Sequence, residues 1–247
     1  FCYLLATLFR DIIFRRTRHF PILNLFGEKG TGKTTLATSL QSFFLHGVDP
    51  PNLGVTSVPA MNDRVSQAVN TLAVLDEYKN DLDIRKIAYL KGLWGGMEAQ
   101  TIVTTSVALC GQDKPTQDMA LYTRVIFLAF SKTSFNQNEK RAYEDLVSVC
   151  NMGLTHLTLE ILGHRELFEK NFPEIYSIIG SFHWPPSGHW RQSLTYLSAM
   201  RSFLKQQLKE YATRMSWLRK VQRYQTSGVC FRDSRLQGNV LRRHITA

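Results

Sequence analysis

The chain has 247 residues, 44% of them apolar, which is enough for one sizeable core or for one core with an appendage. No apolar run approaches the roughly 18 residues of a membrane span, and the four scattered cysteines form no C-x-x-C pair, which argues against a disulfide framework and a zinc site. The formal net charge of +10 lies wholly in residues 191–247, because residues 1–190 hold 18 basic and 18 acidic side chains.

The ends of the chain and its cysteines predict where the protein works. Arginines follow the apolar-rich residues 1–14, whereas a signal peptide would place them first. The first residue is Phe1 rather than Met, so we expect a piece of a longer protein. Unpaired cysteines are typical of a reducing compartment, and we expect a cytoplasmic protein. The basic excess at the C-terminus is typical either of a polyanion partner, most often nucleic acid, or of a solvated tail.

The predicted elements begin with a helix over residues 3–14, whose leucines and isoleucines recur at helical spacing. His19-Phe20-Pro21 interrupts this pattern. The apolar run of residues 22–26 then predicts a fully buried strand, and residues 33–45 predict the helix behind a glycine-rich loop.

This loop has the pattern Gly27-x-x-x-x-Gly32-Lys33-Thr34 of a phosphate-binding loop, and a chance match rarely falls between a buried strand and a helix. In such loops backbone amides and the helix N-terminus hold phosphate oxygens. Lys33 would reach the β- and γ-phosphates, and Thr34 would give its hydroxyl to Mg²⁺. We therefore expect ATP and Mg²⁺ as cofactors. The predicted nucleotide-binding residues are Gly27, Glu28, Lys29, Gly30, Thr31, Gly32, Lys33, Thr34 and Thr35.

Strands and helices continue to alternate along the chain, which predicts an α/β fold with a parallel sheet and helices on both faces. The further predicted elements are a short strand over 55–58, a helix from Asn62 or Asp63 to about residue 70, a strand over 71–76, a helix over 83–91, a loop over 92–96, strands over 102–110 and 124–130, and helices from 131 to about 181.

The strand over 71–76 ends in two carboxylates, Asp76 and Glu77. Asp76 would emerge beside the glycine-rich loop, where it can hold the magnesium shell. Glu77 can polarise the attacking water as a general base, which a nucleotide kinase does not need because its acceptor is not water. Adjacent acids are also typical of a solvated turn, but beside this loop the pair predicts hydrolysis.

Spacing predicts a third polar residue at the site. Lys33 and Asp76 are 43 residues apart, which favours the ATPase class with an extra strand between the two motif strands. That class places a polar residue after the next strand, in contact with the γ-phosphate or the water. Gln112 fits this position, with Asp113 as a second candidate.

Arg124 stands at the entry to the last predicted strand. An arginine there can point across a subunit boundary and stabilise transition-state charge on a neighbour's γ-phosphate. The alternative is an ordinary surface arginine beside a strand. The first interpretation implies a ring or filament of identical chains.

Several segments along the chain carry a family resemblance: LLATLFRDIIF, FPILNLFGEKGTGKT, PPNL, VPAMNDRVSQAVN, VLDEYKN, YLKGLW, ALCGQDKPTQDMALYTRVIFLAF and MGLTHLTLEIL. Together they resemble the helicase-like ATPase module of toprim-type primase-helicases from phages and bacterial mobile elements, which is similar to superfamily-3 helicases and to the wider AAA+ group. The resemblance spans about residues 3–182. It implies a P-loop NTPase fold, single-stranded DNA and identical subunits as partners, and a primase part elsewhere in the full-length chain. The implied Walker A, Walker B, sensor-1 and finger residues are Lys33, Thr34, Asp76, Glu77, Gln112 and Arg124.

Two stretches depart from that family. The connection between residues 96 and 101 is short where relatives tend to carry a longer, basic, DNA-gripping insertion, so strand translocation does not follow from the resemblance. Residues 183–247 match nothing in the family. Apolar residues recur every seven positions there and predict a basic helix over about 192–224, which could pack on the core, pair with another chain or lie along nucleic acid, with disorder beyond Gln225.

These patterns predict four regions: an N-terminal helical segment (1–20), a P-loop ATPase core (21–135), a helical lid-like segment (136–182) and a basic helical tail (183–247). The favoured function is an ATP-hydrolysing motor acting on DNA in the replication of a phage or mobile element. Two alternatives keep the same fold, an ATP-switched loader acting on protein and a nucleotide-binding module without turnover. Glu77 argues against a third, a phosphotransferase.

Overall fold

The computed structural model describes residues 2–44, 49–98, 101–132, 134 and 136–181, all of which belong to the first of two units into which the chain divides, Phe1–Phe203. The basic tail predicted over 183–247, with its helix and heptad repeat, lies outside the described residues. In the described part of the chain, no helix has both the length and the apolar character needed to cross a bilayer.

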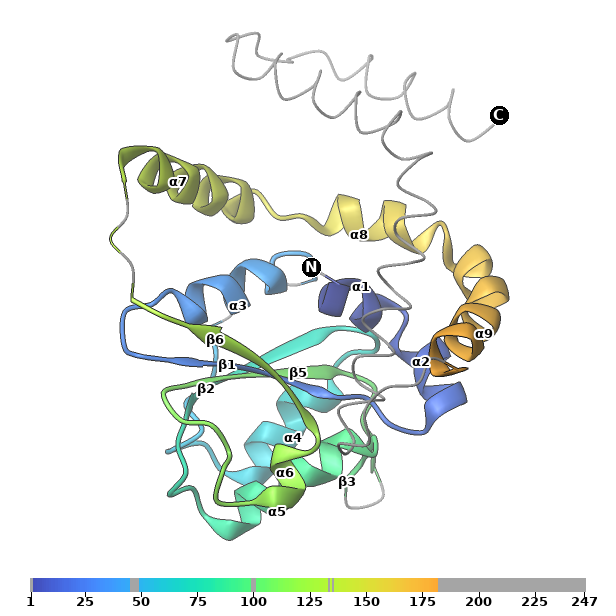
Figure 1. Ribbon diagram of the computed structural model, residues 1–247, viewed down its shortest axis with the longest axis horizontal. Helices are drawn as coiled ribbons and strands as arrows, with labels where there is room; N and C mark the ends of the chain where they lie inside the picture. Colours follow the sequence, from blue (N-terminus) through green and yellow to red (C-terminus); the bar gives the residue numbers. More distant parts are fainter. Residues whose placement is uncertain (1, 45–48, 99–100, 133, 135, 182–247) are drawn as a thin grey trace, which may run out of the picture. The chain divides into compact units, whose positions relative to one another are not determined.

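A parallel sheet of four strands forms the centre of the described unit (Figure 1). The strands are β1 (Ile22–Gly27), β2 (Leu72–Tyr78), β5 (Ser106–Gly111) and β6 (Val125–Phe130), in the spatial order β2-β5-β1-β6. Because every pairing is parallel, all four strands end at one edge, called the carboxyl edge below, and begin at the opposite amino edge. β5 lies between β1 and β2, which confirms the intervening strand that the motif spacing predicted.

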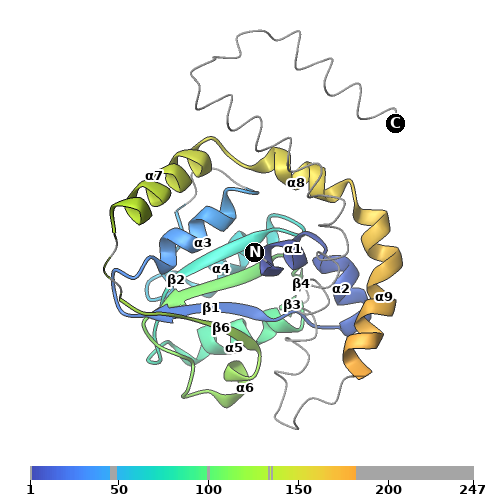
Figure 2. The ribbon, with the colours of Figure 1, turned by 45° about the horizontal axis from the view of Figure 1, so that its top comes forward.

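Helices cover both faces of the sheet, as the alternation of elements predicted (Figures 1 and 2). On one face α3 (Lys33–Gln41) packs on β1, β2 and β5, with α1 (Cys2–Leu8) beside it. On the other face α4 (Val58–Ser66), α5 (Ile84–Trp94) and α6 (Met119–Tyr122) share one apolar cluster with the strands. The inner strand β5 is buried at every position, as expected for a parallel strand covered on both sides.

Side-chain caps fix where several helices begin. Ser57 accepts a hydrogen bond from the Ala60 N–H and starts α4, and Asp83 accepts from the Arg85 N–H and starts α5. Asn136 forms a reciprocal capping box with the third residue of α7 (Gln137–Asn151). By fixing where these helices begin, the caps also fix where the segments that lead from the carboxyl edge to the helices end.

The strand predicted over 55–58 is wrong. Val55 is 85% exposed, and Ser57 caps α4 instead of joining a sheet. Only Asn52 forms a bridge there, in parallel with Asp76 at the end of β2. The helix predicted from Asn62 or Asp63 is α4, which begins at Val58, four or five residues earlier, because Ser57 supplies the cap.

Other boundaries also differ from the prediction. The first predicted helix is two helices, α1 and α2 (Arg10–Thr17), which meet at Phe9. α3 ends at Gln41, and α5 runs through the predicted loop as far as Trp94. The strand predicted from residue 102 begins at Ser106, because the preceding residues form a short antiparallel pair, β3 (Met97–Glu98) and β4 (Thr101–Ile102).

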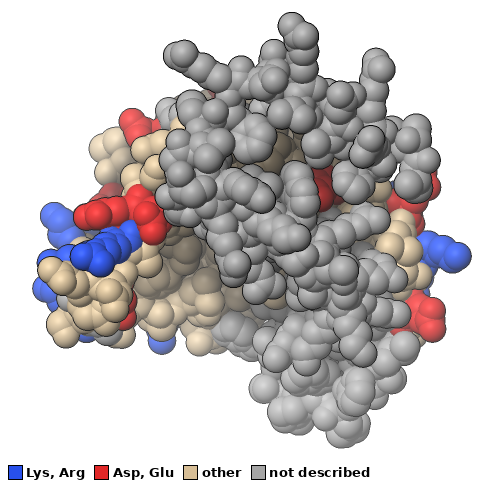
Figure 3. All heavy atoms as spheres, turned by 90° about the horizontal axis from the view of Figure 1, so that it is seen from above, with Lys and Arg blue, Asp and Glu red and all other residues tan. Residues whose placement is uncertain are grey.

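After the sheet the described residues are helical up to residue 181, as predicted, and form α7, α8 (Thr155–Leu162) and α9 (Arg165–Ser181). They run past α3 to the N-terminal helices (Figure 2). Thr158 Oγ1 donates to the Phe43 carbonyl at 2.7 Å, and the rings of Phe9 and Phe168 stack at 4.4 Å. On the face seen in Figure 3, the basic and acidic side chains of the described residues are interspersed, in keeping with the balanced charge of residues 1–190.

Candidate active site

At the carboxyl edge, β1 continues into the glycine-rich loop that leads to α3. Gly27, Gly30 and Gly32 have φ values of 149°, 81° and 83°, a region that side chains with a Cβ rarely adopt. A Cβ on Gly27 would stand 2.1 Å from the Phe130 carbonyl oxygen of β6, so only glycine fits there. α3 begins directly after Gly32, and its unpaired N–H groups face the loop, a geometry that suits an anion.

The Lys33 side chain folds over this loop and is only 8% exposed. Its Nζ donates to the carbonyl oxygens of Gly27 (2.8 Å) and Glu28 (2.6 Å) and to Thr31 Oγ1 (3.2 Å). All three acceptors are neutral, so they orient the ammonium group without cancelling its charge. The loop therefore presents a partly desolvated cation, whose attraction for an anion is stronger than in bulk water.

One contact joins the loop segment to β2: Thr34 Oγ1 donates to Asp76 Oδ2 at 3.1 Å. The other carboxylate oxygen, Oδ1, accepts from the Glu77 N–H at 2.8 Å. A hydroxyl and a carboxylate are hard oxygen ligands of the kind Mg²⁺ prefers, and Mg²⁺ fills its other positions with water and phosphate oxygens. The two side chains brought together here fit such an ion.

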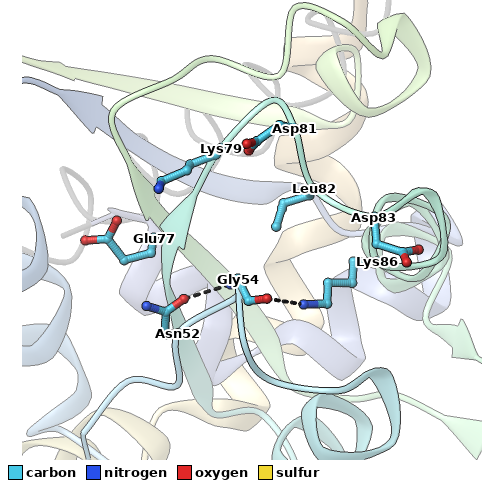
Figure 4. A pocket seen from close by; sticks show the side chains of 8 residues that line it. All are labelled: Asn52, Gly54, Glu77, Lys79, Asp81, Leu82, Asp83 and Lys86. Carbon is cyan, nitrogen blue, oxygen red and sulfur yellow. Dashed lines mark hydrogen bonds between the residues drawn. The ribbon is translucent and has the colours of Figure 1, made fainter.

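Glu77 is exposed and has a φ of 59°, in the left-handed region. For a residue other than glycine this conformation costs roughly 1–2 kcal/mol. Its side chain lines a polar pocket of about 260 Å³. Figure 4 shows Asn52 and Lys79 near Glu77 in this pocket, and Lys86 bonded to the Gly54 carbonyl at 2.8 Å. The carboxylate is thus placed where water reaches it.

Gln112 follows β5, the strand between β1 and β2. Gly111, just before it, pairs with Phe26 on one side and with Tyr78 on the other. The Gln112 side chain is exposed at this point, whereas Asp113 accepts a hydrogen bond from the Asn80 N–H at 3.1 Å. The backbone contact gives Asp113 a local structural role and leaves Gln112 as the better candidate of the two.

Arg124 lies at the amino edge, away from the other predicted residues. Ile22 pairs with Val125 and Gly27 with Phe130, so five residue steps separate Arg124's end of β6 from the loop. At 3.3 Å per residue this is about 16 Å, beyond the reach of an arginine side chain. Arg124 can therefore meet a ligand of this kind of loop only on another copy of the chain.

Two buried groups close to the site are neutral at pH 7, and burial keeps them neutral to higher pH. It raises the pKa of the Cys110 thiol to about 12, and the Asp76 carboxylate adds to the rise while Lys33 opposes it. Burial also raises the pKa of Tyr78 to about 12, with Asp113 and Asp118 adding to the effect. Neither group carries charge at neutral pH, so neither competes with Lys33 or Asp76 for a charged ligand.

Asn52 belongs to this region although no sequence pattern predicted it. The Leu53 N–H donates to the Asp76 carbonyl at 2.8 Å, and the Asp76 N–H donates to the Pro51 carbonyl at 2.9 Å. Asn52 Oδ1 accepts from the Gly54 N–H at 2.7 Å, which holds the side chain beside Glu77 in the pocket. A single bridge leaves no periodic signal in the sequence, so the position of Asn52 was not predicted.

Comparison with known proteins gives a fold but no family. No family model and no curated protein matches the chain. Among solved structures, it is similar to SCCmec type IV Cch, an active helicase, with a TM-score of 0.60 and 13% identity over 91% of this chain and 48% of that one. The chain thus spans about half of that structure, with which it shares a helicase-like fold. The JCV helicase is a weaker match, with a TM-score of 0.37 and 14% identity over 72% of this chain and 63% of that one.

Proposed function

We propose that the chain is a P-loop ATPase domain of the AAA+/superfamily-3 type that hydrolyses ATP with Mg²⁺ and acts as a motor on DNA. The observation that carries this proposal is the contact between Thr34 and Asp76, which joins the glycine-rich loop to the acidic end of β2. Glu77 and Gln112 lie at the same edge, and the helicase-like fold supports a motor rather than a kinase.

The glycine-rich loop binds the triphosphate in this proposal. Its amides and the N-terminus of α3 hold phosphate oxygens, and Lys33 exchanges its carbonyl contacts for the β- and γ-phosphates. Thr34 and Asp76 hold Mg²⁺. When bound, the ion neutralises charge that develops on the phosphates.

Glu77 and Gln112 act on the attacking water. Glu77 accepts a proton from the water at the open pocket, and the Gln112 amide orients that water or the γ-phosphate. Arg124 of a neighbouring copy supplies positive charge to the transition state, because its own loop is out of reach. The working assembly is then a ring of identical chains.

The substrate of the motor is single-stranded DNA, and the domain serves a primase-helicase of a phage or mobile element in the bacterial cytoplasm. The family resemblance of residues 3–182, the fold shared with a helicase and the basic residues 191–247 support this part of the proposal.

Steady-state ATP hydrolysis tests the proposal. The chain is assayed alone, with single-stranded DNA and with duplex DNA, and Lys33→Met serves as the loop-deficient control. We expect turnover that rises at least about tenfold with single-stranded DNA, as for a motor whose working state is completed by its track. Turnover that no nucleic acid changes would contradict the DNA motor, and turnover that responds to protein instead would indicate the loader.

A further inference from the structure

Three side chains from separate segments form a stack at the amino edge of the sheet. The ring of His19 lies 4.4 Å from that of Trp94, with their planes 14° apart. The Arg124 Cζ lies 5.2 Å from the centroid of the Trp94 ring, within the distance of a cation–π contact. His19 precedes β1, Trp94 ends α5 and Arg124 precedes β6.

Backbone hydrogen bonds hold these segments together. The Phe20 N–H donates to the Trp94 carbonyl at 2.9 Å, and the Ile22 N–H donates to the Arg124 carbonyl at 3.0 Å. His19, which packs on the indole, is only 8% exposed. The indole is therefore a fixed platform, held in place by the segment that contains His19 and Phe20.

The Arg124 guanidinium rests on this platform, and none of the described residues gives it a counter-charge. Its Nη1 donates to the Ala120 carbonyl at 2.5 Å, while Nε is buried with no acceptor among the described residues. None of the ion pairs formed within the described part of the chain includes Arg124. An aromatic face can orient the cation without cancelling its charge, which leaves that charge available to an external anion.

We propose that Trp94 is the positioning residue of Arg124, and that the indole face holds the guanidinium in the orientation from which it meets the phosphates of a nucleotide bound by another copy of the chain. This inference rests on the proposed function, in which Arg124 acts across a subunit boundary. Trp94 itself touches no substrate. It lowers the entropy lost when a long, flexible side chain is fixed for catalysis.

Two substitutions separate positioning from packing. Trp94→Phe keeps an aromatic face, and Trp94→Leu keeps an apolar side chain without a ring. We expect Trp94→Leu to lower kcat for ATP about tenfold with KM within about twofold, and Trp94→Phe to retain most of kcat, because a cation–π contact depends on the ring. If the role of the tryptophan were merely structural, the loss of kcat in each variant would follow the loss of its thermal stability. Trp94→Met serves as the second ring-free variant if Trp94→Leu does not fold.

Mixed assemblies test the role across the subunit boundary. One chain carries Arg124→Ala with an intact loop, and the other carries Lys33→Met with an intact Arg124. Turnover returns in the mixture only where Arg124 of the second chain faces the nucleotide of the first. We expect Trp94→Leu to lower this turnover about tenfold when placed in the Lys33→Met chain. In the Arg124→Ala chain it has no guanidinium to position, and turnover should stay.

Each outcome has one meaning. Restored turnover that Trp94→Leu changes in neither chain overturns the positioning role and leaves the proposed ATPase intact. A mixture that restores no turnover, although the wild-type chain hydrolyses ATP, shows that Arg124 does not act between chains and also overturns the inference. A wild-type chain without any ATP turnover would instead contradict the proposed function, and the inference with it.

Discussion

The junction between α2 and α9 differs from the carboxyl edge of the sheet in what its polar side chains contact. At the junction, Asp11 pairs with Arg165 and accepts from Asn70 Nδ2 at 2.7 Å, and Arg15 pairs with Glu169 at 2.6 Å. At the carboxyl edge, the side chains of Glu77 and Gln112 are exposed and form no hydrogen bond with the described residues. Glu77 also keeps a strained backbone.

This difference distinguishes polar side chains that stabilise the fold from polar side chains that make no stabilising contact with the described residues. The ion pairs at the junction tie the last described helix to the first ones, and their removal should cost stability. A strained carboxylate with no partner costs stability by being present, which is typical of residues kept for binding or catalysis. The comparison therefore points to the carboxyl edge as the functional one.

The largest effect is expected from Gly111→Ala at the carboxyl edge. The new Cβ would stand 2.3 Å from the Tyr78 carbonyl oxygen. Both atoms belong to backbone segments of the sheet, so neither can move away easily. We expect a loss of about 3 kcal/mol in the free energy of unfolding, measured by urea denaturation. Gly95→Ala is the matched control, because its Cβ would lie 3.6 Å from the Gly92 carbonyl. Equal urea midpoints for the two variants would show that the edge has room to adjust.

A smaller loss is expected from Arg165→Met at the junction. Burial alone would raise the pKa of Asp11, but hydrogen bonds from Arg165 and Asn70 lower it below its usual value. A carboxyl with a lowered pKa stabilises the fold above its unfolded pKa and loses that effect as the pH falls through its folded pKa. We expect a loss of about 1 kcal/mol at pH 7 that shrinks below about pH 4. A loss that is independent of pH would contradict the role of the ion pair.

Glu77→Gly should act in the opposite direction and raise stability. Glycine adopts the left-handed conformation without strain, although it also increases the entropy of the unfolded chain, so we expect a net gain of about 0.5 kcal/mol in unfolding experiments. Asp81→Gly is the control, because Asp81 is exposed nearby and does not have a positive φ. A gain in both variants, or a loss in Glu77→Gly, would show that Glu77 stores no strain.

The smallest effect is expected from Glu169→Gln. Its ion pair with Arg15 joins side chains that are 48% and 61% exposed. Such pairs contribute about 0.5 kcal/mol or less, and salt screens them. Thermal unfolding at low and at high salt should therefore give nearly the same midpoint for variant and wild type. If Glu169→Gln lowered the free energy of unfolding as much as Arg165→Met does, solvent exposure would not explain the difference between these two ion pairs.

Long-range order at the carboxyl edge was predictable from sequence because its signals are strong. The apolar runs before Gly27 and Asp76 mark strands buried on both faces, and the spacing of Lys33 and Asp76 predicted the strand between them. Parallel pairing then brings Gln112 to the same edge. The residue roles assigned to these positions remain predictions.

Contacts without periodicity were not predictable. The segment 55–58 has apolar residues typical of a strand, but the Ser57 cap and the following proline start a helix there instead. The stack of Arg124 on Trp94 joins residues from distant segments through one tertiary contact. The sequence predicted a loop at 92–96, whereas Trp94 is the last residue of α5, so this contact was not predicted. Such contacts depend on packing that no local pattern records.

The most direct test of the central claim compares ATP binding and ATP turnover in wild type and Glu77→Gln, with Lys79→Met as a control from the same pocket. We expect Glu77→Gln to bind ATP with wild-type affinity and to lose turnover at least about a hundredfold, because the amide cannot accept the proton of the attacking water. Lys79→Met should keep both activities. Wild-type turnover in Glu77→Gln, with binding intact, would show that the carboxyl edge does not use this carboxylate as its base and would contradict the account.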